Sequence, residues 1–159
     1  MNLNPKQFKI LEWLNRNSEH RVSVIAPFRE GRGDRAHYFL DAAPVDDLGD
    51  DIEALIDNLV LMPTFKDIVN PLSRERVWYS LNSMALWNED KADVPSEIWT
   101  VKFWYSVHTA RSCRGVFYSK PMPSQSQALS FVDTLERKKQ GYRLKAVVHY
   151  RNFLSLLVR

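Results

Sequence analysis

The chain has 159 residues, close to the usual size of one domain, with 45% hydrophobic and 26% charged residues. These average fractions exclude a wholly disordered chain, a coiled coil and a collagen-like fibre. The net charge of +3 permits nucleic acid as a partner without requiring it, and 5 glycines leave little material for a glycine-rich phosphate loop.

The first half of the chain is predicted to contain two helices and three strands. Asn4 and Pro5 form a helix start, and Phe8 and Leu11 follow at helical spacing. Alternation of apolar and polar residues predicts the strands. The elements in chain order are a helix that starts at 4–5 and ends near 15–17, strands over 21–29 and 36–42, a helix over 46–59 and a strand over 65–69.

The second half is predicted to contain two further helices and three further strands. Val77, Leu81 and Met84 are spaced as one face of a helix, whereas Trp99, Val101 and the residues after them alternate as in a strand. The elements are a helix over 73–87, strands over 97–108 and 116–120, a helix that starts at Ser124 or Ser126 and ends near 139, and a strand over 142–151. The apolar tail 153–158 must pack against something.

This order of elements predicts an α+β fold in which antiparallel sheets carry helices on one face. Both halves read helix, strand, strand, helix, strand, and a shift of 79 residues aligns them without a gap, with 6 identities over residues 21–72. We therefore expect two tandem αββαβ repeats. The alternative is a ferredoxin-like order of elements that begins at Phe65 and ends at Arg151.

The two halves differ in charge. Residues 1–79 form an acidic αββαβ half with a net charge of −3, and residues 80–159 form a basic half with +6 that contributes ββαβ. The predicted helix 73–87 lies at the seam, and the halves should form one compact unit because each alone holds only a thin core. Trp78, Trp87 and Trp99 fit either the contact between the halves or a homodimer interface.

One face of the C-terminal sheet is predicted to be basic, with a flat aromatic side chain among its cations. Such a face suits nucleic acid, because cations meet phosphates while tryptophan stacks on a base. The alternatives are a protein partner and the ordinary solvated face of an antiparallel sheet. The residues of this predicted face and its hairpin are Lys102, Trp104, His108, Arg111, Arg114, Arg143, Lys145, His149 and Arg151.

The predicted helix 46–59 is acidic, in contrast to the basic sheet face, because several aspartates lie in its first turns. They could dock a basic partner, although acidic residues also favour the first turn of any helix. The predicted protein-interaction residues are Asp46, Asp47, Asp50 and Asp51.

No residue pattern indicates a metal or a cofactor, because the four histidines lack ligand spacing. A metal-free ribonuclease remains an alternative, since histidine or tyrosine can move protons while arginine stabilises a phosphorane. Its candidate residues are His108, Arg111, Arg114 and Tyr118.

We expect a small, non-enzymatic binding protein that regulates or inhibits its target. The target is nucleic acid or a nucleic-acid-binding protein. The lone Cys113 excludes an internal disulfide and fits the cytoplasm, and no apolar stretch is long enough to enter a membrane. Compact, tryptophan-rich chains without catalytic motifs often come from phages or other mobile elements, and this base rate alone suggests such an origin.

Overall fold

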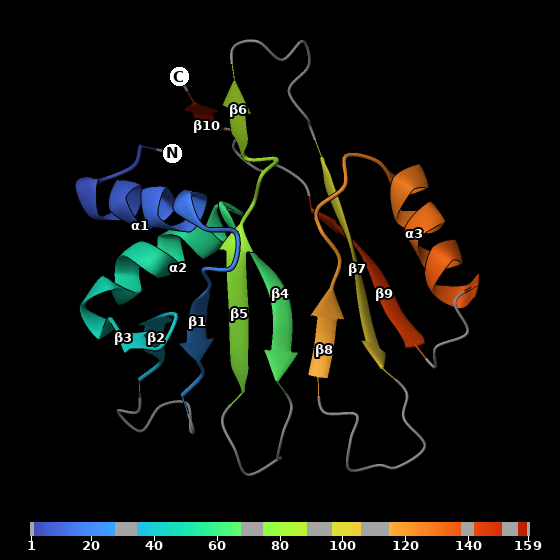
Figure 1. Cartoon of the computed structure of the whole chain (residues 1–159), viewed down its shortest axis with the longest axis horizontal. Helices are drawn as coiled ribbons and strands as arrows, with labels where there is room; N and C mark the ends of the chain where they lie inside the picture. The colour runs from blue at the N-terminus through green and yellow to red at the C-terminus, as the bar shows by residue number, and fades with distance from the viewer. Residues whose placement is uncertain are drawn as a thin grey trace. The chain divides into compact units, whose positions relative to one another are not determined.

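The structure, a computed structural model, describes residues 2–27, 35–67, 75–88, 97–105, 115–137, 142–150 and 156–158. The chain divides into two compact units, Met1–Leu81 and Asn82–Arg159 (Figure 1). Each unit contains strands paired in an antiparallel sheet and at least one helix packed against that sheet. The predicted α+β class is therefore confirmed.

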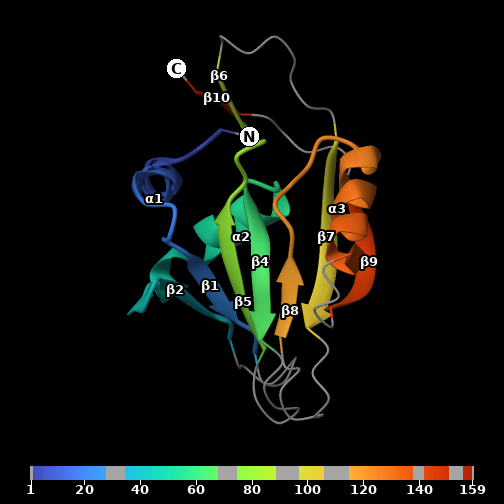
Figure 2. The same ribbon diagram turned by 45° about the vertical axis from the view of Figure 1, so that its right-hand side comes forward.

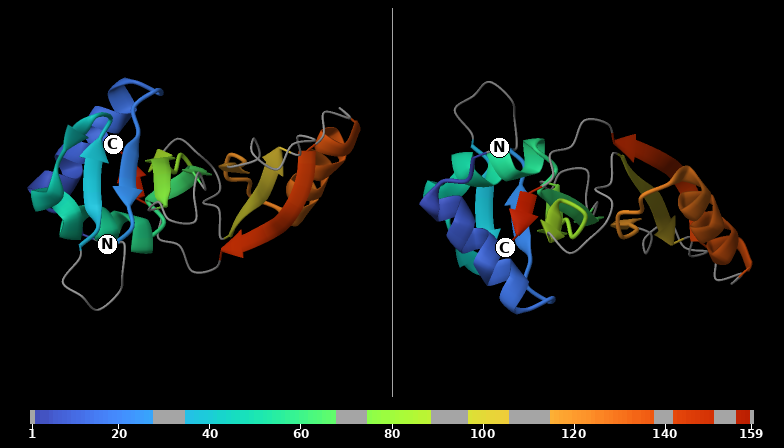
Figure 3. Two further views of the ribbon diagram at one scale, coloured as in Figure 1. Left: turned by 90° about the horizontal axis from the view of Figure 1, so that it is seen from below. Right: turned by 90° about the horizontal axis from the view of Figure 1, so that it is seen from above.

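Helix α1 (Pro5–Arg16) begins at a capping box. The Asn4 side chain accepts a hydrogen bond from the Gln7 backbone N–H at 2.8 Å, and the Gln7 side chain accepts one from the Asn4 backbone N–H at 3.0 Å. Asn4 Nδ2 also donates to Asp51 Oδ1 in the first turn of helix α2 (Gly49–Asp57), at 2.6 Å. The start of α1 is thereby tied to the start of α2 (Figure 3).

The sheet of unit 1 runs in the order β3-β2-β1-β5-β4 among the described residues, and all its neighbouring strands are antiparallel. Because β5 lies between β1 and β4, those two strands run in the same direction. The strands are β1 (Val22–Ile25), β2 (His37–Leu40), β3 (Ala43–Pro44), β4 (Leu61–Asp67) and β5 (Arg76–Leu81).

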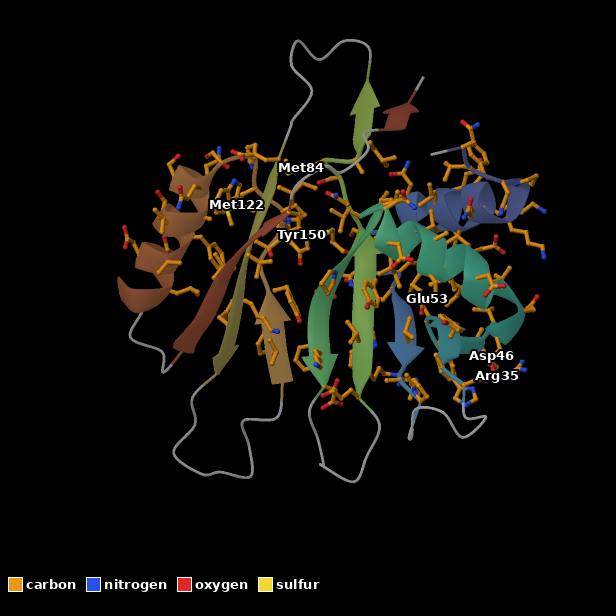
Figure 4. All side chains as sticks on the ribbon, turned by 180° about the vertical axis from the view of Figure 1, so that it is seen from behind. Arg35, Asp46, Glu53, Met84, Met122 and Tyr150 are labelled. Carbon is orange, nitrogen blue, oxygen red and sulfur yellow. The ribbon has the colours of Figure 1, made fainter. Side chains whose placement is uncertain are left out.

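One face of this sheet packs against α2. A Cβ atom at Gly49 would lie 2.7 Å from a ring carbon of Tyr38 in β2, so the close approach of helix and strand depends on glycine. The Tyr38 hydroxyl donates to Glu53 Oε1 at 2.7 Å, and Figure 4 shows Glu53 on α2. Burial and this bond raise the pKa of the Tyr38 hydroxyl well above its usual value. Tyr38 therefore faces the helices.

Unit 2 contains the sheet β8-β7-β9, whose neighbours are antiparallel, and a separate parallel pair of strands, β6 and β10. Helix α3 packs on β7 and β9 (Figure 2). The buried centre of this packing is formed by Val101, Ala128 and Val132. The elements are β6 (Leu86–Asn88), β7 (Ile98–Tyr105), β8 (Gly115–Tyr118), α3 (Gln125–Arg137), β9 (Tyr142–Tyr150) and β10 (Leu156–Val158).

The prediction of a helix over 73–87 is wrong. Residues 76–81 form strand β5, and residues 86–88 form β6. The apolar residues have helical spacing. Residues 76–81 also fit a strand, because Val77, Tyr79 and Leu81 alternate with Arg76, Trp78 and Ser80, and because Val, Trp and Tyr favour strands. Pairing with β1 and β4 decides between the two patterns. The ferredoxin-like order also required this helix and is wrong for the same reason.

Two boundaries also differ from the predictions. The expected helix 46–59 starts as a short 3-10 turn, η1 (Asp46–Leu48), and its α-helical part ends at Asp57. Leu59 then takes a positive φ of 59°, which turns the chain into β4. This strand begins at Leu61 rather than at residue 65.

The tandem repeat stays a prediction, and its second half lacks the expected first helix because residues 76–81 form strand β5. A shift of 79 residues superposes the register of the two hairpins, because Ser23 pairs with Phe39 in unit 1 and Lys102 pairs with Tyr118 in unit 2. The last strands do not correspond in their pairing. In unit 1, β4 pairs with β5, whereas in unit 2, β9 pairs directly with β7.

The burial pattern of α1 predicts how its substitutions affect stability. Leu11 is 7% exposed and Phe8 is 54% exposed on the same helix. Leu11→Ala should lower the free energy of unfolding by about 2–5 kcal/mol. Phe8→Ala should change it by no more than about 0.5 kcal/mol, because little of its ring is buried. Urea unfolding followed by circular dichroism measures both, and equal losses would contradict this packing.

Candidate nucleic-acid interface

The predicted basic face lies on β7 and β9 of unit 2, and the structure describes part of it. Lys102 and Trp104 lie in β7, and Arg143, Lys145 and His149 lie in β9. The remaining predicted residues lie outside the described part of the chain: His108, Arg111, Arg114 and Arg151.

The pairing of β7 with β9 determines which of these positions are neighbours. Trp104 pairs with Arg143, so a tryptophan and an arginine position lie directly across from each other. Lys102 pairs with Ala146, and the register shifts immediately after Lys102. Because of this shift, Lys145 has no directly opposed position on β7.

His149 takes a different register position from the rest of the predicted face. It pairs with Trp99, which packs against the core under α3. Lys102 and Trp104 belong to the other alternating set of β7, because successive strand positions point to opposite faces. The pairing therefore groups the positions of Lys102, Trp104 and Arg143, and it sets His149 apart from them.

Lys102 is held against an aromatic ring. Its cross-strand neighbour on β8 is Tyr118, and the Lys102 Nζ lies 5.6 Å from the centroid of the Tyr118 ring. At this distance an ammonium is attracted to the ring. Both side chains are half-buried, so the contact fixes a cation on the sheet while leaving part of it accessible.

The same face is closed to solvent farther along β7. Ile98 and Thr100 lie four and two positions before Lys102, on the same face of β7, and they are 0% and 1% exposed. Burial raises the pKa of the Tyr150 hydroxyl, and Tyr150 pairs with Ile98. On this face, β7 is therefore buried at Ile98 and Thr100 and partly accessible at Lys102.

A row of aromatic residues crosses the sheet of unit 1, and the sequence analysis missed it. Ser23 pairs with Phe39 on one side and with Trp78 on the other, and Trp78 pairs with Phe65. The Phe65 and Trp78 rings lie 5.5 Å apart. The period-two alternation of residues 76–81 is the signal that could have found this row, which we name the aromatic row (Phe39, Trp78 and Phe65).

Asp46, the first of the predicted acidic interaction residues, is used inside unit 1. Its Oδ1 accepts a hydrogen bond from the Tyr38 backbone N–H at 2.9 Å, and its Oδ2 lies 3.0 Å from His37 Nδ1. These two contacts, the backbone bond first, hold the pKa of the Asp46 carboxyl below its usual value. Asp46, labelled in Figure 4, therefore connects η1 to β2 through these two contacts.

The other predicted acidic residues divide into two groups. Asp51 is half-buried and accepts the hydrogen bond from Asn4 described above. Asp47 and Asp50 are exposed at the start of the helical segment. Of the four carboxylates, Asp47 and Asp50 are the better placed to meet a partner.

Asp41 forms a second cluster at the opposite end of β2. Its Oδ1 accepts from the Arg21 backbone N–H at 2.9 Å, and its Oδ2 lies 2.7 Å from His20 Nδ1. The backbone bond and the nearby histidine hold the pKa of the Asp41 carboxyl below its usual value. The His20 ring is stacked on Trp13 at 3.9 Å, which links α1 to this end of the sheet.

Within the part of the chain that the structure describes, no three His, Cys, Asp or Glu side chains gather closely enough to hold a metal ion. Among the same residues, no helix has the length and apolar character that crossing a bilayer requires. No protein-family model, curated protein or solved structure matches the chain. The assignment of a function therefore rests on the chemistry of its surfaces.

The two low-pKa carboxyl groups predict how stability depends on pH. Asp41 and Asp46 bind protons less readily in the folded chain than the usual pKa of 3.8 implies. Their contribution is present above about pH 4 and is lost as the pH falls through their folded pKa values. Asp41→Asn should reduce the acid-side loss of stability, and asparagine tolerates the positive φ of 52° at this position.

Urea unfolding of the full chain between pH 2 and pH 6 measures this effect. The matched control is Asp57→Asn, which replaces an exposed aspartate at the end of α2, away from the Asp41 cluster. An identical slope in Asp41→Asn and the parent chain would show that the Asp41 cluster does not contribute.

Proposed function

We propose that the chain is a non-enzymatic binding protein, a regulator or inhibitor, whose target is nucleic acid or a protein that handles nucleic acid. The observation that carries the proposal is the placement of Lys102, whose ammonium lies over the Tyr118 ring on the face of the sheet opposite α3. Cations fixed beside aromatic rings on a sheet provide both contacts that a strand of nucleic acid needs, phosphate attraction and base stacking.

The neighbouring register strengthens the proposal. Trp104 lies two residues beyond Lys102 in β7 and pairs with Arg143, so one small area of backbone carries two cationic residue types and one tryptophan. The basic charge of residues 80–159 favours an anionic partner for the same unit. A cytoplasmic location and a phage or mobile-element origin belong to the proposal as well.

The two alternatives have less support. The metal-free ribonuclease relies on His108, Arg111 and Arg114, which lie outside the described residues, so it stays a prediction. The protein-interaction module would now depend on Asp47 and Asp50, because Asp46 and Asp51 take part in internal hydrogen bonds.

A triple substitution tests the proposed surface. Lys102→Ala, Trp104→Ala and Arg143→Ala together should weaken binding of a labelled single-stranded oligonucleotide. Loss of one stacked base costs roughly 1–3 kcal/mol, and each lost phosphate contact should flatten the slope of log K against log salt by about 0.7. Fluorescence anisotropy at several salt concentrations measures both quantities.

The matched control removes two exposed lysines of α1, Lys6→Ala and Lys9→Ala. This control changes the net charge by the same amount in the other unit. Circular dichroism verifies that each variant is folded. Unchanged affinity in a folded triple variant would remove the proposed surface.

A further inference from the structure

The aromatic row lies on the face of the unit 1 sheet that points away from its helices. Tyr38 contacts α2 through Gly49 and Glu53, and it pairs with Val24, which in turn pairs with Val77. Strand positions alternate between faces, so the residues one position away share the opposite face. Those residues are Ser23, Phe39 and Trp78, together with Phe65 and Arg76.

Arg76 is fixed over two rings of this row. Its guanidinium carbon lies 4.8 Å from the centroid of the Phe39 ring and 5.3 Å from the centroid of the Trp78 ring. Stacking on both rings restricts a long side chain that would otherwise sample many rotamers. A ligand that binds this guanidinium therefore loses less side-chain entropy than one that binds a free surface arginine.

The charge of Arg76 has no acidic counterpart in the structure as described. Among the described residues, no carboxylate forms an ion pair with it, although Asp67 pairs with it in the strand register. The neighbouring cation behaves differently, because Lys66 Nζ lies 2.9 Å from Glu75 Oε2. Arg76 therefore offers an external anion a cation that no described carboxylate neutralises.

Two polar atoms of the same face lack hydrogen-bond partners among the described residues. They are Arg76 Nε and Ser23 Oγ, and both are buried. Ser23 is 2% exposed and occupies the position between Phe39 and Trp78. Leaving such groups unpaired carries a cost that structures usually avoid, so this part of the face has hydrogen-bonding capacity that the described residues do not use.

We propose that the aromatic row and Arg76 form a second binding surface, which takes single-stranded nucleic acid. The guanidinium binds a phosphate, and an unpaired base stacks on the layer formed by the guanidinium and the rings. Paired bases in a duplex are already stacked and cannot use such a surface, whereas bases of a single strand can. The inference rests on the proposed function, because it names the form of nucleic acid and adds a site in unit 1.

The test compares a labelled single-stranded oligonucleotide of about 20 uridines with a labelled RNA duplex of the same length. Arg76→Gln and Trp78→Leu should each weaken binding of the single strand roughly 5- to 150-fold, the loss expected for one stacked base. Binding of the duplex should be weaker than binding of the single strand in the parent chain and should change little in either variant. The matched control is Trp13→Phe, since Trp13 stacks on His20 away from this surface.

Arg76→Lys keeps the proposal testable if Arg76→Gln does not fold. Lysine retains the charge and loses the planar stacking group. The affinity of Arg76→Lys for the single strand should therefore be lower than that of the parent chain. Where Arg76→Gln can be measured, the affinity of Arg76→Lys should be higher than that of Arg76→Gln. Thermal unfolding monitors the folded state of every variant.

The outcomes separate this inference from the proposed function. If the parent chain binds neither single strand nor duplex, the surface in unit 1 is overturned together with nucleic acid as the direct target, and only a nucleic-acid-handling protein is left as the target in the proposed function. If the parent chain binds and the triple variant of unit 2 binds more weakly, while folded Arg76 and Trp78 variants bind as the parent does, only the surface in unit 1 is overturned. Equal affinity for duplex and single strand would also overturn it.

Discussion

The hydrogen bonds that β5 forms along both of its edges hold unit 1 together. On one edge it pairs with β1, and on the other it pairs with β4. Without this strand, β4 would have no connection through the sheet of unit 1 to the hairpin of β1 and β2. The alternation of β5 also divides its side chains, because Val77 shares a face with Tyr38 and the helices while Arg76 and Trp78 point the other way. Both the core and the aromatic row of unit 1 depend on this pairing.

Much of the fold could be predicted from local patterns. The Asn4–Pro5 helix start, the alternation of the first hairpin and the long alternation of β7 each contain their structural signal within a few residues. The segment 73–87 could not be settled in this way, since Val77, Leu81 and Met84 satisfy a helical spacing as well as residues 76–81 satisfy a strand. The decisive interactions are with strands far away in the sequence, and no local pattern encodes them. The short strands β3 and β6 carry too few residues to give any signal.

The candidate sites show the same limit. Composition and alternation predicted that Lys102 and Trp104 share a face of β7, and the register brings Arg143 opposite Trp104. The separate position of His149 follows from a shift of register between β7 and β9, which sequence cannot show. The contact of Arg76 with Phe39 and Trp78 joins β2 with β5 across an intervening strand, and a helix over 73–87 does not predict it.

The central proposal is that this chain binds nucleic acid, with Lys102 and Arg76 held against aromatic rings on its sheets. The most direct measurement is the affinity of the unaltered chain for a single-stranded oligonucleotide over a series of salt concentrations. Since each phosphate contact contributes about −0.7 to the slope of log K against log salt, contacts from Lys102, Arg143 and Arg76 predict a slope of about −2 or steeper. Absence of binding at low salt, or binding that does not depend on salt, would contradict the account.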